Sequence, residues 1–234
     1  MKVEIWSDVV CPWCYIGKRR FETALSKFPQ RDQVEVVYRS FELDPGSPVG
    51  GTQSVVESLA EKYGGGVDNA RRMLARVSEV AAQDGLEYHL DKSRSENTFD
   101  AHRLLHFART RGLQKELKER LMKAYFTEGR SISVREELVA VAAEVGLDAD
   151  EVRAVLADEQ RFANDVRQDV RTAQSLGVRG VPFFVLEGKY GISGAQPLEV
   201  FEQALQRAWQ EASPLQVVAS GEACDDTGCD VPKR

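Results

Sequence analysis

The chain has 234 residues, of which 42% are hydrophobic, so it can bury one large core or two small ones. Its formal net charge of −6 argues against nucleic acid or an anionic membrane surface as a partner. Because no run of about 18 apolar residues occurs, no membrane-spanning helix is expected, and residue 3 already begins a predicted strand where a secretion signal would stand. Four cysteines without such a signal favour a cytoplasmic protein over a disulfide-stapled secreted one.

The first forty residues predict a strand, a helix and a second strand. Residues 3–6 alternate in polarity, which is typical of a short strand, and apolar residues then recur at spacings of three and four up to about residue 28. A second alternating run covers residues 34–41. The glycines and prolines of residues 43–51 predict an exit loop.

A Cys-Pro-Trp-Cys motif lies where the first strand passes into the helix. Pro12 suits a first helical turn, which needs no N–H there, so the unpaired amides and the helix dipole should point at the sulfur of Cys11. Such a site stabilises a thiolate, and we expect the pKa of Cys11 to fall below that of a free thiol. Cys14, one turn later, could attack a mixed disulfide at Cys11. A redox pair is favoured over a buried cysteine pair or half a metal site.

Residues 52–176 carry a helical period almost throughout. Apolar stripes predict seven helices, and their side chains are expected to form a core rather than a cofactor site. Residues 86–90 are expected to be extended. Ser133 with Glu136 predicts a capping box at the start of the fifth helix, and Asp148 with Glu151 the start of the sixth.

Strand patterns return near the end of the chain. Residues 183–186 and 190–193 predict a hairpin, and a last helix follows from residue 197. The order predicts one discontinuous domain formed by residues 1–50 and 177–212. An inserted helical domain would span 51–176, and a cysteine-containing tail would occupy 213–234.

Four motifs together resemble a known family. They are Cys-Pro-Trp-Cys at 11–14, Asn-Thr-Phe-Asp-Ala-His-Arg-Leu at 97–104, Gly-Val-Pro-Phe-Phe at 180–184 and Ile-Ser-Gly-Ala-Gln at 192–196. Over residues 1–211 the chain is similar to the thioredoxin superfamily, to DsbA-type proteins within it, and to their FrnE-like branch. The resemblance implies an α/β, thioredoxin-like fold with a large all-α insertion between the second and third strands.

The same resemblance implies the rest of the active site. Val181–Pro182 would be a cis peptide facing Cys11, with the Val181 backbone free to pair with an extended substrate. From position alone, Pro182 would be an ordinary trans proline at a strand entry. Pro12 and Trp13 would also contact substrate. DsbA enzymes carry His where this chain has Trp13, so we expect a less acidic Cys11 and a less oxidising couple than in DsbA.

Two histidines lie four residues apart in the third predicted helix. His102 and His106 have the spacing of a metal clamp, but neither has an acidic companion at the spacing of zinc proteases, so no metal is expected. By its place in the family-like segment, His102 is expected to line the groove over the active site. A packed core histidine is the equal alternative.

The tail contains a second cysteine pair, Cys224 and Cys229, for which three interpretations remain open. The pair could relay electrons to or from Cys11 and Cys14. It could form a small disulfide that closes only on itself, or join the first pair around zinc. Sequence alone does not give cysteine connectivity.

These features predict a protein thiol–disulfide oxidoreductase, acting as a reductase or isomerase in the cytoplasm. Its cofactor would be its own redox-active disulfide, and its partners would be protein or peptide thiols and disulfides, with glutathione or a thioredoxin-type system as candidates for recycling. One alternative is the glutathione-dependent group that resembles kappa-class transferases and hydroxychromene-carboxylate isomerases, which usually hold Ser at the place of Cys11. Another is a redox-controlled binding or chaperone protein.

Overall fold

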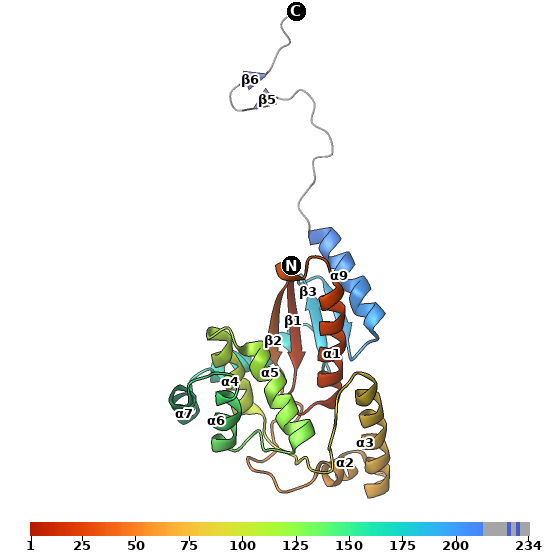
Figure 1. Cartoon of the computed structure of the whole chain (residues 1–234), viewed down its shortest axis with the longest axis vertical. Helices are drawn as coiled ribbons and strands as arrows, with labels where there is room; N and C mark the ends of the chain where they lie inside the picture. Colours follow the sequence, from red (N-terminus) through yellow and green to blue (C-terminus); the bar gives the residue numbers. More distant parts are fainter. Residues whose placement is uncertain (213–223, 226–227, 230–234) are drawn as a thin grey trace, which may run out of the picture.

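The computed structural model describes residues 1–212 in full and the backbone of residues 224–225 and 228–229 (Figure 1). In chain order the elements are β1 (Lys2–Ser7), α1 (Pro12–Lys27), a 3-10 helix (Arg31–Gln33), β2 (Glu35–Ser40), α2 (Val55–Tyr63), α3 (Gly66–Gln83), α4 (Phe99–Thr110), α5 (Gln114–Lys123), a short π-helix (Ala124–Glu128), α6 (Arg135–Ala143), α7 (Ala149–Ala157), α8 (Ala163–Ser175), β3 (Phe183–Leu186), β4 (Tyr190–Ser193), α9 (Leu198–Ala212), β5 (Cys224–Asp225) and β6 (Gly228–Cys229).

A four-stranded sheet in the order β2-β1-β3-β4 organises the first and last parts of the chain. β1 and β2 are parallel, whereas β3 is antiparallel to both of its neighbours, β1 and β4. Because side chains alternate along a strand, Ile5 of β1 packs with Phe21 of α1 and Phe201 of α9, and Trp6 packs on the other face with Ala173 of α8. The sheet is therefore covered on both faces, and α1 and α9 lie side by side (Figure 1).

The helices α2 to α8 all lie between β2 and β3, so the predicted thioredoxin-like fold with an all-α insertion is confirmed. Their apolar stripes form one buried cluster, which includes Leu104, Phe107 and Leu121. The same cluster contains Cys14 and Tyr15 from the first turn of α1. The insertion therefore packs against the end of α1 that carries the cysteine motif.

A buried arginine ties two helices of the insertion together. Arg103 of α4 is 1% exposed, and its guanidinium donates to the carbonyl oxygens of Val155, Asp158 and Arg161, at and just beyond the end of α7. It also pairs with Asp100 at 2.6 Å. Because the last carbonyls of a helix have no partner within it, this side chain supplies one.

The predicted capping box at Ser133 and Glu136 is wrong. The N-cap of α6 is Val134 and not Ser133, and the apolar side chain of Val134 cannot accept a hydrogen bond from the helix. The Ser133 hydroxyl instead accepts from the backbone amide of Gly50 at 2.8 Å. A reciprocal capping box forms at the start of α2, between Ser54 and Glu57.

Two further details of the insertion differ from the predicted elements. The helix expected up to residue 125 ends as α5 at Lys123 and continues as a short π-helix, Ala124–Glu128. Residues 86–90 form no strand. Instead, the His89 amide donates to the carbonyl of Phe126 in this π-helix, at 2.6 Å. A long-range contact therefore replaces the expected local structure.

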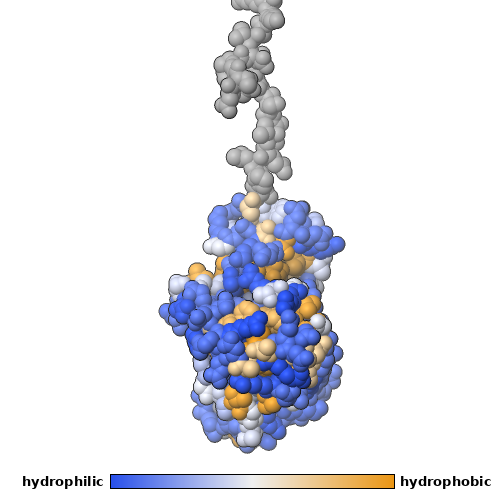
Figure 2. Space-filling view, turned by 90° about the vertical axis from the view of Figure 1, so that its left-hand side faces the viewer, coloured by the Kyte–Doolittle hydropathy of each residue, from blue (hydrophilic) through white to orange (hydrophobic). Residues whose placement is uncertain are grey.

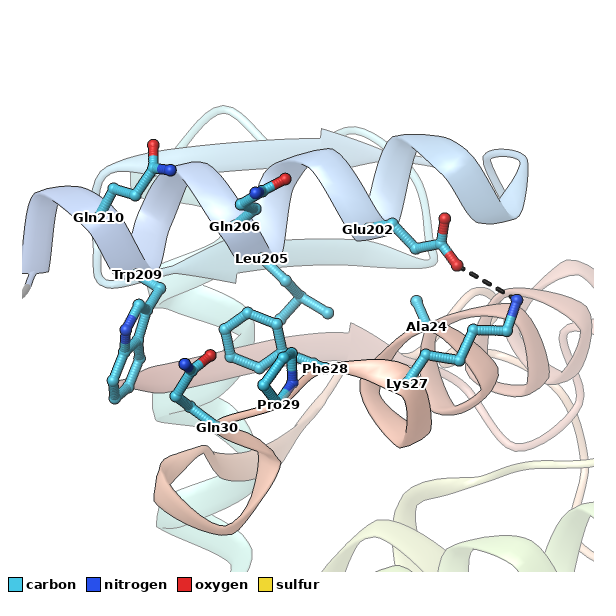
Figure 3. A pocket seen from close by; sticks show the side chains of 10 residues that line it. All are labelled: Ala24, Lys27, Phe28, Pro29, Gln30, Glu202, Leu205, Gln206, Trp209 and Gln210. Atoms are coloured by element: carbon cyan, nitrogen blue, oxygen red, sulfur yellow. Dashed lines mark hydrogen bonds and ion pairs between the residues drawn. The ribbon is translucent and has the colours of Figure 1, made fainter.

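The surface shows two further features. On the side that carries α7 in Figure 1, hydrophilic residues predominate, with hydrophobic ones showing between them (Figure 2). A hollow of about 450 Å³ lies between the end of α1 and α9, beside Phe28, Leu205 and Trp209 and next to the Lys27–Glu202 ion pair of 3.2 Å (Figure 3).

None of the helices within residues 1–212 combines the length and hydrophobicity that a bilayer crossing needs.

Candidate active site

The two cysteines of the motif frame the first turn of α1. Cys11 is the N-cap residue, and Pro12 occupies the first helical position, as predicted. The amide of Cys14 donates to the carbonyl of Cys11 at 3.0 Å. Both thiols are free, and the residues are 4% and 1% exposed respectively. The helix start therefore places Cys11 at its positive end, with Cys14 directly behind.

The loop before β3 meets Cys11 from the far end of the chain. The carbonyl oxygen of Val181 lies 3.6 Å from the sulfur of Cys11, and the Val181–Pro182 peptide is cis, as the family resemblance implied. Gly17 makes this approach possible, because a Cβ at that position would lie 2.8 Å from Cγ of Pro182. The structure thus brings both predicted halves of the site together.

A buried carboxylate lies immediately after β1. Asp8 is fully buried, and its Oδ1 accepts from the Val9 amide at 2.7 Å and lies 3.1 Å from Nε2 of His102. Its Oδ2 accepts from the Leu43 amide at 2.8 Å. Burial raises the pKa of Asp8, but the hydrogen bonds from His102 and the Leu43 amide, together with the charge of Lys118, outweigh it and hold the pKa below its usual value. Asp8 is therefore a buried anion beside the cysteines.

A buried lysine lies near the end of β1, at Ser7, which precedes Asp8 in the chain. Lys118 of α5 has no exposed surface, and its Nζ donates to the carbonyl of Ser7 at 3.3 Å. Burial lowers the pKa of Lys118 to about 8, against the attraction of Cys14 and Asp8. Burial also raises the pKa of Cys14 well above that of a free thiol; Cys11 adds to this rise and Lys118 opposes it.

Sequence reasoning missed both Asp8 and Lys118. Asp8 had a usable signal, since a charged residue directly after a strand and before a cysteine motif is well placed for a site. Lys118 had none, because α5 carries four Lys or Arg residues in ten and nothing local distinguishes this one.

A cavity of about 600 Å³ opens beside Cys11, between the sheet end and the insertion. Its walls are largely apolar. They include Cys11, Pro12, Trp13 and Val181 from the predicted site, and Leu43, Val55, Leu59, Tyr63, Met73, Leu74, Val77, Leu90, Tyr125 and Phe126. Four of the predicted site residues thus share one cavity.

The outer wall of the cavity is exposed. Trp13 is 43% exposed, Tyr63 62% and Met73 42%, although such large apolar side chains are usually covered. α2, which contributes Val55 and Leu59, contains no fully buried residue. An exposed apolar patch around a free cysteine is typical of a surface that binds another molecule.

The expectation that His102 lines the groove is not met. His102 is fully buried and is not among the residues that line the cavity, because its side chain turns inward to Asp8. His106 turns elsewhere, to the Ser40 hydroxyl and to Asp169, each at 3.1 Å. The two histidines therefore have different hydrogen-bond partners. Residues 1–212 contain no cluster of three or more metal-binding side chains.

The predicted second cysteine pair lies outside the residues whose side chains the structure describes. Only the backbone of its two short strands is described, with Cys224 opposite Cys229 in an antiparallel pair. The three interpretations of this pair stay open.

Comparisons with known proteins agree with this geometry. A probable DsbA oxidoreductase of Streptomyces coelicolor is 50% identical, with complete coverage of both chains and a TM-score of 0.87. The cytosolic disulfide reductase DsbM of Pseudomonas aeruginosa, solved with GSH, is 19% identical with a TM-score of 0.64, covering 90% of this chain and 100% of that one, which shows the fold alone. The uncharacterized protein YwbO of Bacillus subtilis is 28% identical over 216 residues, 87% of this chain and 94% of YwbO. The model of the DSBA-like thioredoxin domain matches residues 2–206, and the chain therefore belongs to that family.

Proposed function

We propose that this protein exchanges disulfides with protein or peptide thiols through Cys11 and Cys14, as a reductase or isomerase of the FrnE-like branch. The observation that supports this best is the position of Cys11. Its sulfur is at the N-terminal end of a helix, against the Val181 carbonyl, and it opens into a cavity, whereas Cys14 does not line that cavity. Cys11 is thus the sulfur that a substrate can reach.

The reaction proceeds in two exchanges. The Cys11 thiolate attacks one sulfur of a substrate disulfide, the substrate S–S bond breaks, and the other substrate sulfur leaves as a thiolate. Cys14 then attacks Cys11, the bond to the substrate breaks, and the second substrate sulfur leaves. The substrate has gained two electrons, and the enzyme holds a Cys11–Cys14 disulfide.

The electrostatics support this division of roles. Because the pKa of Cys14 is raised well above that of a free thiol, Cys14 stays protonated near neutral pH and does not compete for the substrate. Its place one turn behind Cys11 suits the resolving role.

The cavity supports a polypeptide substrate. The backbone of Val181 can pair with an extended segment beside Cys11, and the apolar wall of α2 and α3 can take a large apolar side chain near the substrate cysteine. DsbM, which shares the fold, is described as a cytosolic disulfide reductase and was solved with GSH. We therefore propose a cytoplasmic location, and glutathione as a candidate reductant for the Cys11–Cys14 disulfide.

Insulin reduction with dithiothreitol tests the proposal. The wild-type protein should accelerate the precipitation of insulin chains, and Cys11→Ser should abolish the acceleration. Cys14→Ala should accumulate a mixed disulfide at Cys11, seen as a mass increase that a reductant removes. A wild-type protein that gives no acceleration, or Cys11→Ser with unchanged activity, would favour a redox-independent binding protein and reject the proposal.

A further inference from the structure

Tyr88 reaches the cysteine motif from the insertion. It lies in the irregular segment between α3 and α4, and its hydroxyl donates to the carbonyl of Pro12 at 2.8 Å. Within residues 1–212 this is the single hydrogen bond that a side chain makes to the backbone of residues 11–14. Burial raises the pKa of Tyr88, so the hydroxyl keeps its proton and acts as a donor. The insertion therefore contacts the motif at the peptide between Pro12 and Trp13.

The short π-helix holds Tyr88 in place from both sides. The carbonyl of Glu87 accepts from the Thr127 hydroxyl at 2.7 Å. The amide of His89 donates to the carbonyl of Phe126 at 2.6 Å. Between these two bonds, the Tyr88 ring stacks on that of Phe126, with 4.7 Å between the ring centroids. Short π-helices are often found at functional sites, and this one fixes the direction of a single hydroxyl.

The sulfur of Cys11 needs a hydrogen-bond donor when it ionises. As a thiol it donates to the Val181 carbonyl at 3.6 Å and makes no cap hydrogen bond to α1. A thiolate has no proton to donate and can only accept. A side chain at the N-cap accepts from the second or third amide of the helix, which here are those of Trp13 and Cys14. The Cys14 amide already donates to the Cys11 carbonyl at 3.0 Å, which leaves the amide of Trp13.

We propose that Tyr88 is a positioning residue that stabilises the Cys11 thiolate through the peptide between Pro12 and Trp13. This role rests on the proposed exchange at Cys11. The Tyr88 hydroxyl donates to the carbonyl of this peptide, and the same peptide carries the Trp13 amide. A hydrogen bond to the carbonyl polarises the peptide and makes its N–H a stronger donor, by on the order of 10–30%. The thiolate therefore gains stability from a hydroxyl that is bonded to the other end of the peptide.

The variant Tyr88→Phe isolates this hydrogen bond, because it keeps the ring and its stacking and removes only the hydroxyl. It also leaves the other ionisable groups in place. The charged or titratable groups that interact electrostatically with Cys11 or Tyr88 are Cys14, Tyr15 and Arg19 of α1 and Lys118 of α5. A change in the ionisation of Cys11 in this variant is therefore due to the hydroxyl.

Alkylation of Cys11 by iodoacetamide, measured across pH on the full chain, tests this role. Peptide mass spectrometry follows Cys11 separately from the other cysteines. We expect Tyr88→Phe to move the midpoint of the pH profile upward by about 0.3–0.5 unit. The rate should then fall by about two- to threefold below the midpoint and stay unchanged at high pH, where the thiolate is fully formed in both proteins.

Tyr15→Phe is the matched control. The ring of Tyr15 stacks on that of Tyr88, with 6.1 Å between the centroids, but its hydroxyl donates to Glu119 at 2.7 Å. Its pH profile should match that of the wild type. An unchanged midpoint in Tyr88→Phe, or an equal shift in Tyr15→Phe, would overturn the proposal. So would an equal loss of rate at every pH in Tyr88→Phe, which is what altered access to the sulfur predicts.

The equilibrium with glutathione gives a second measurement. The thiolate belongs to the reduced enzyme, so loss of the Tyr88 hydroxyl should favour the Cys11–Cys14 disulfide by about two- to threefold above the midpoint pH. Tyr15→Phe should leave this equilibrium unchanged, and an unchanged equilibrium in Tyr88→Phe would contradict the role of its hydroxyl. Neither measurement uses insulin, so a failure of the proposed function in insulin reduction is distinguishable from a failure of this role.

Discussion

The carbonyl oxygen of Val181 lies 3.6 Å from the sulfur of Cys11, across 170 residues of sequence. The contact depends on how closely α1 approaches the loop before β3, and Gly17 sets that approach. A glycine on one helix thus lets the Val181–Pro182 loop lie against the sulfur of Cys11, where we propose that a substrate backbone binds.

Gly17→Ala should therefore impair activity. Alanine favours a helix by about 1 kcal/mol over glycine, but its Cβ would lie 2.8 Å from Pro182 and 3.4 Å from Phe184. Because overpacking costs about 1–3 kcal/mol, we expect a net loss of stability and a fall of about tenfold in insulin reduction. Gly46→Ala is the control, since its Cβ meets only the Asp44 side chain at 3.5 Å. Unchanged activity in a folded Gly17→Ala variant would contradict the role assigned to this approach.

The apolar wall of the cavity should determine which substrates bind. Leu59→Glu places a charge in this wall, so we expect KM to rise by about tenfold for a peptide disulfide that has an aromatic residue next to its cysteine. A tenfold rise corresponds to a loss of about 1.4 kcal/mol in binding free energy. Turnover of a small hydrophilic disulfide such as oxidised glutathione should change much less.

The control for Leu59→Glu is Val67→Glu, in an exposed residue of α3 that does not line the cavity. Equal effects of Leu59→Glu and Val67→Glu on the peptide KM would show that the cavity does not select the substrate.

Lys118 should make stability depend on pH above neutrality. Its pKa is near 10.5 when unfolded and about 8 when folded, so unfolding takes up a proton between these values. Stability therefore rises with pH through this window, by up to about 3 kcal/mol. Urea unfolding of Cys11→Ser/Cys14→Ser, which removes the thiol titrations, should show this rise. The rise should be lost when Lys118→Met is added, and identical profiles would contradict the burial of a charged lysine.

Arg103 should be important for stability and not for chemistry. Arg103→Met leaves the carbonyls of residues 155, 158 and 161 and the carboxylate of Asp100 without this partner, and we expect a loss of about 3 kcal/mol in unfolding free energy. Arg153→Met, in a half-exposed arginine that pairs with Asp150, should cost at most about 0.5 kcal/mol. Thermal or urea unfolding of the two variants provides the comparison, and equal losses would contradict this role.

The sequence by itself determined the local features of the site. A strand that ends at Ser7 and a helix that begins at Pro12 are both short-range patterns, and together they put Cys11 at a helix N-terminus. The hairpin of β3 and β4, the order of the helices and the N-cap at Asp148 also follow from neighbouring residues. The cis peptide at Pro182 was reached only through the family resemblance, since no local pattern distinguishes it from a trans proline.

Only the tertiary structure decided which distant side chains share the buried space behind the cysteines. The pattern in α5 marks a buried face and a charged face, but it does not say that Lys118 is buried and donates to the Ser7 carbonyl. Likewise, the sequence pattern predicted a helix cap at Ser133, but the Ser133 hydroxyl accepts from the Gly50 amide. The family resemblance placed His102 in the groove, but its ring hydrogen-bonds to the buried Asp8. In each case the partner belongs to another element, and a polar group bonds to whichever partner the packing of the whole chain brings within reach.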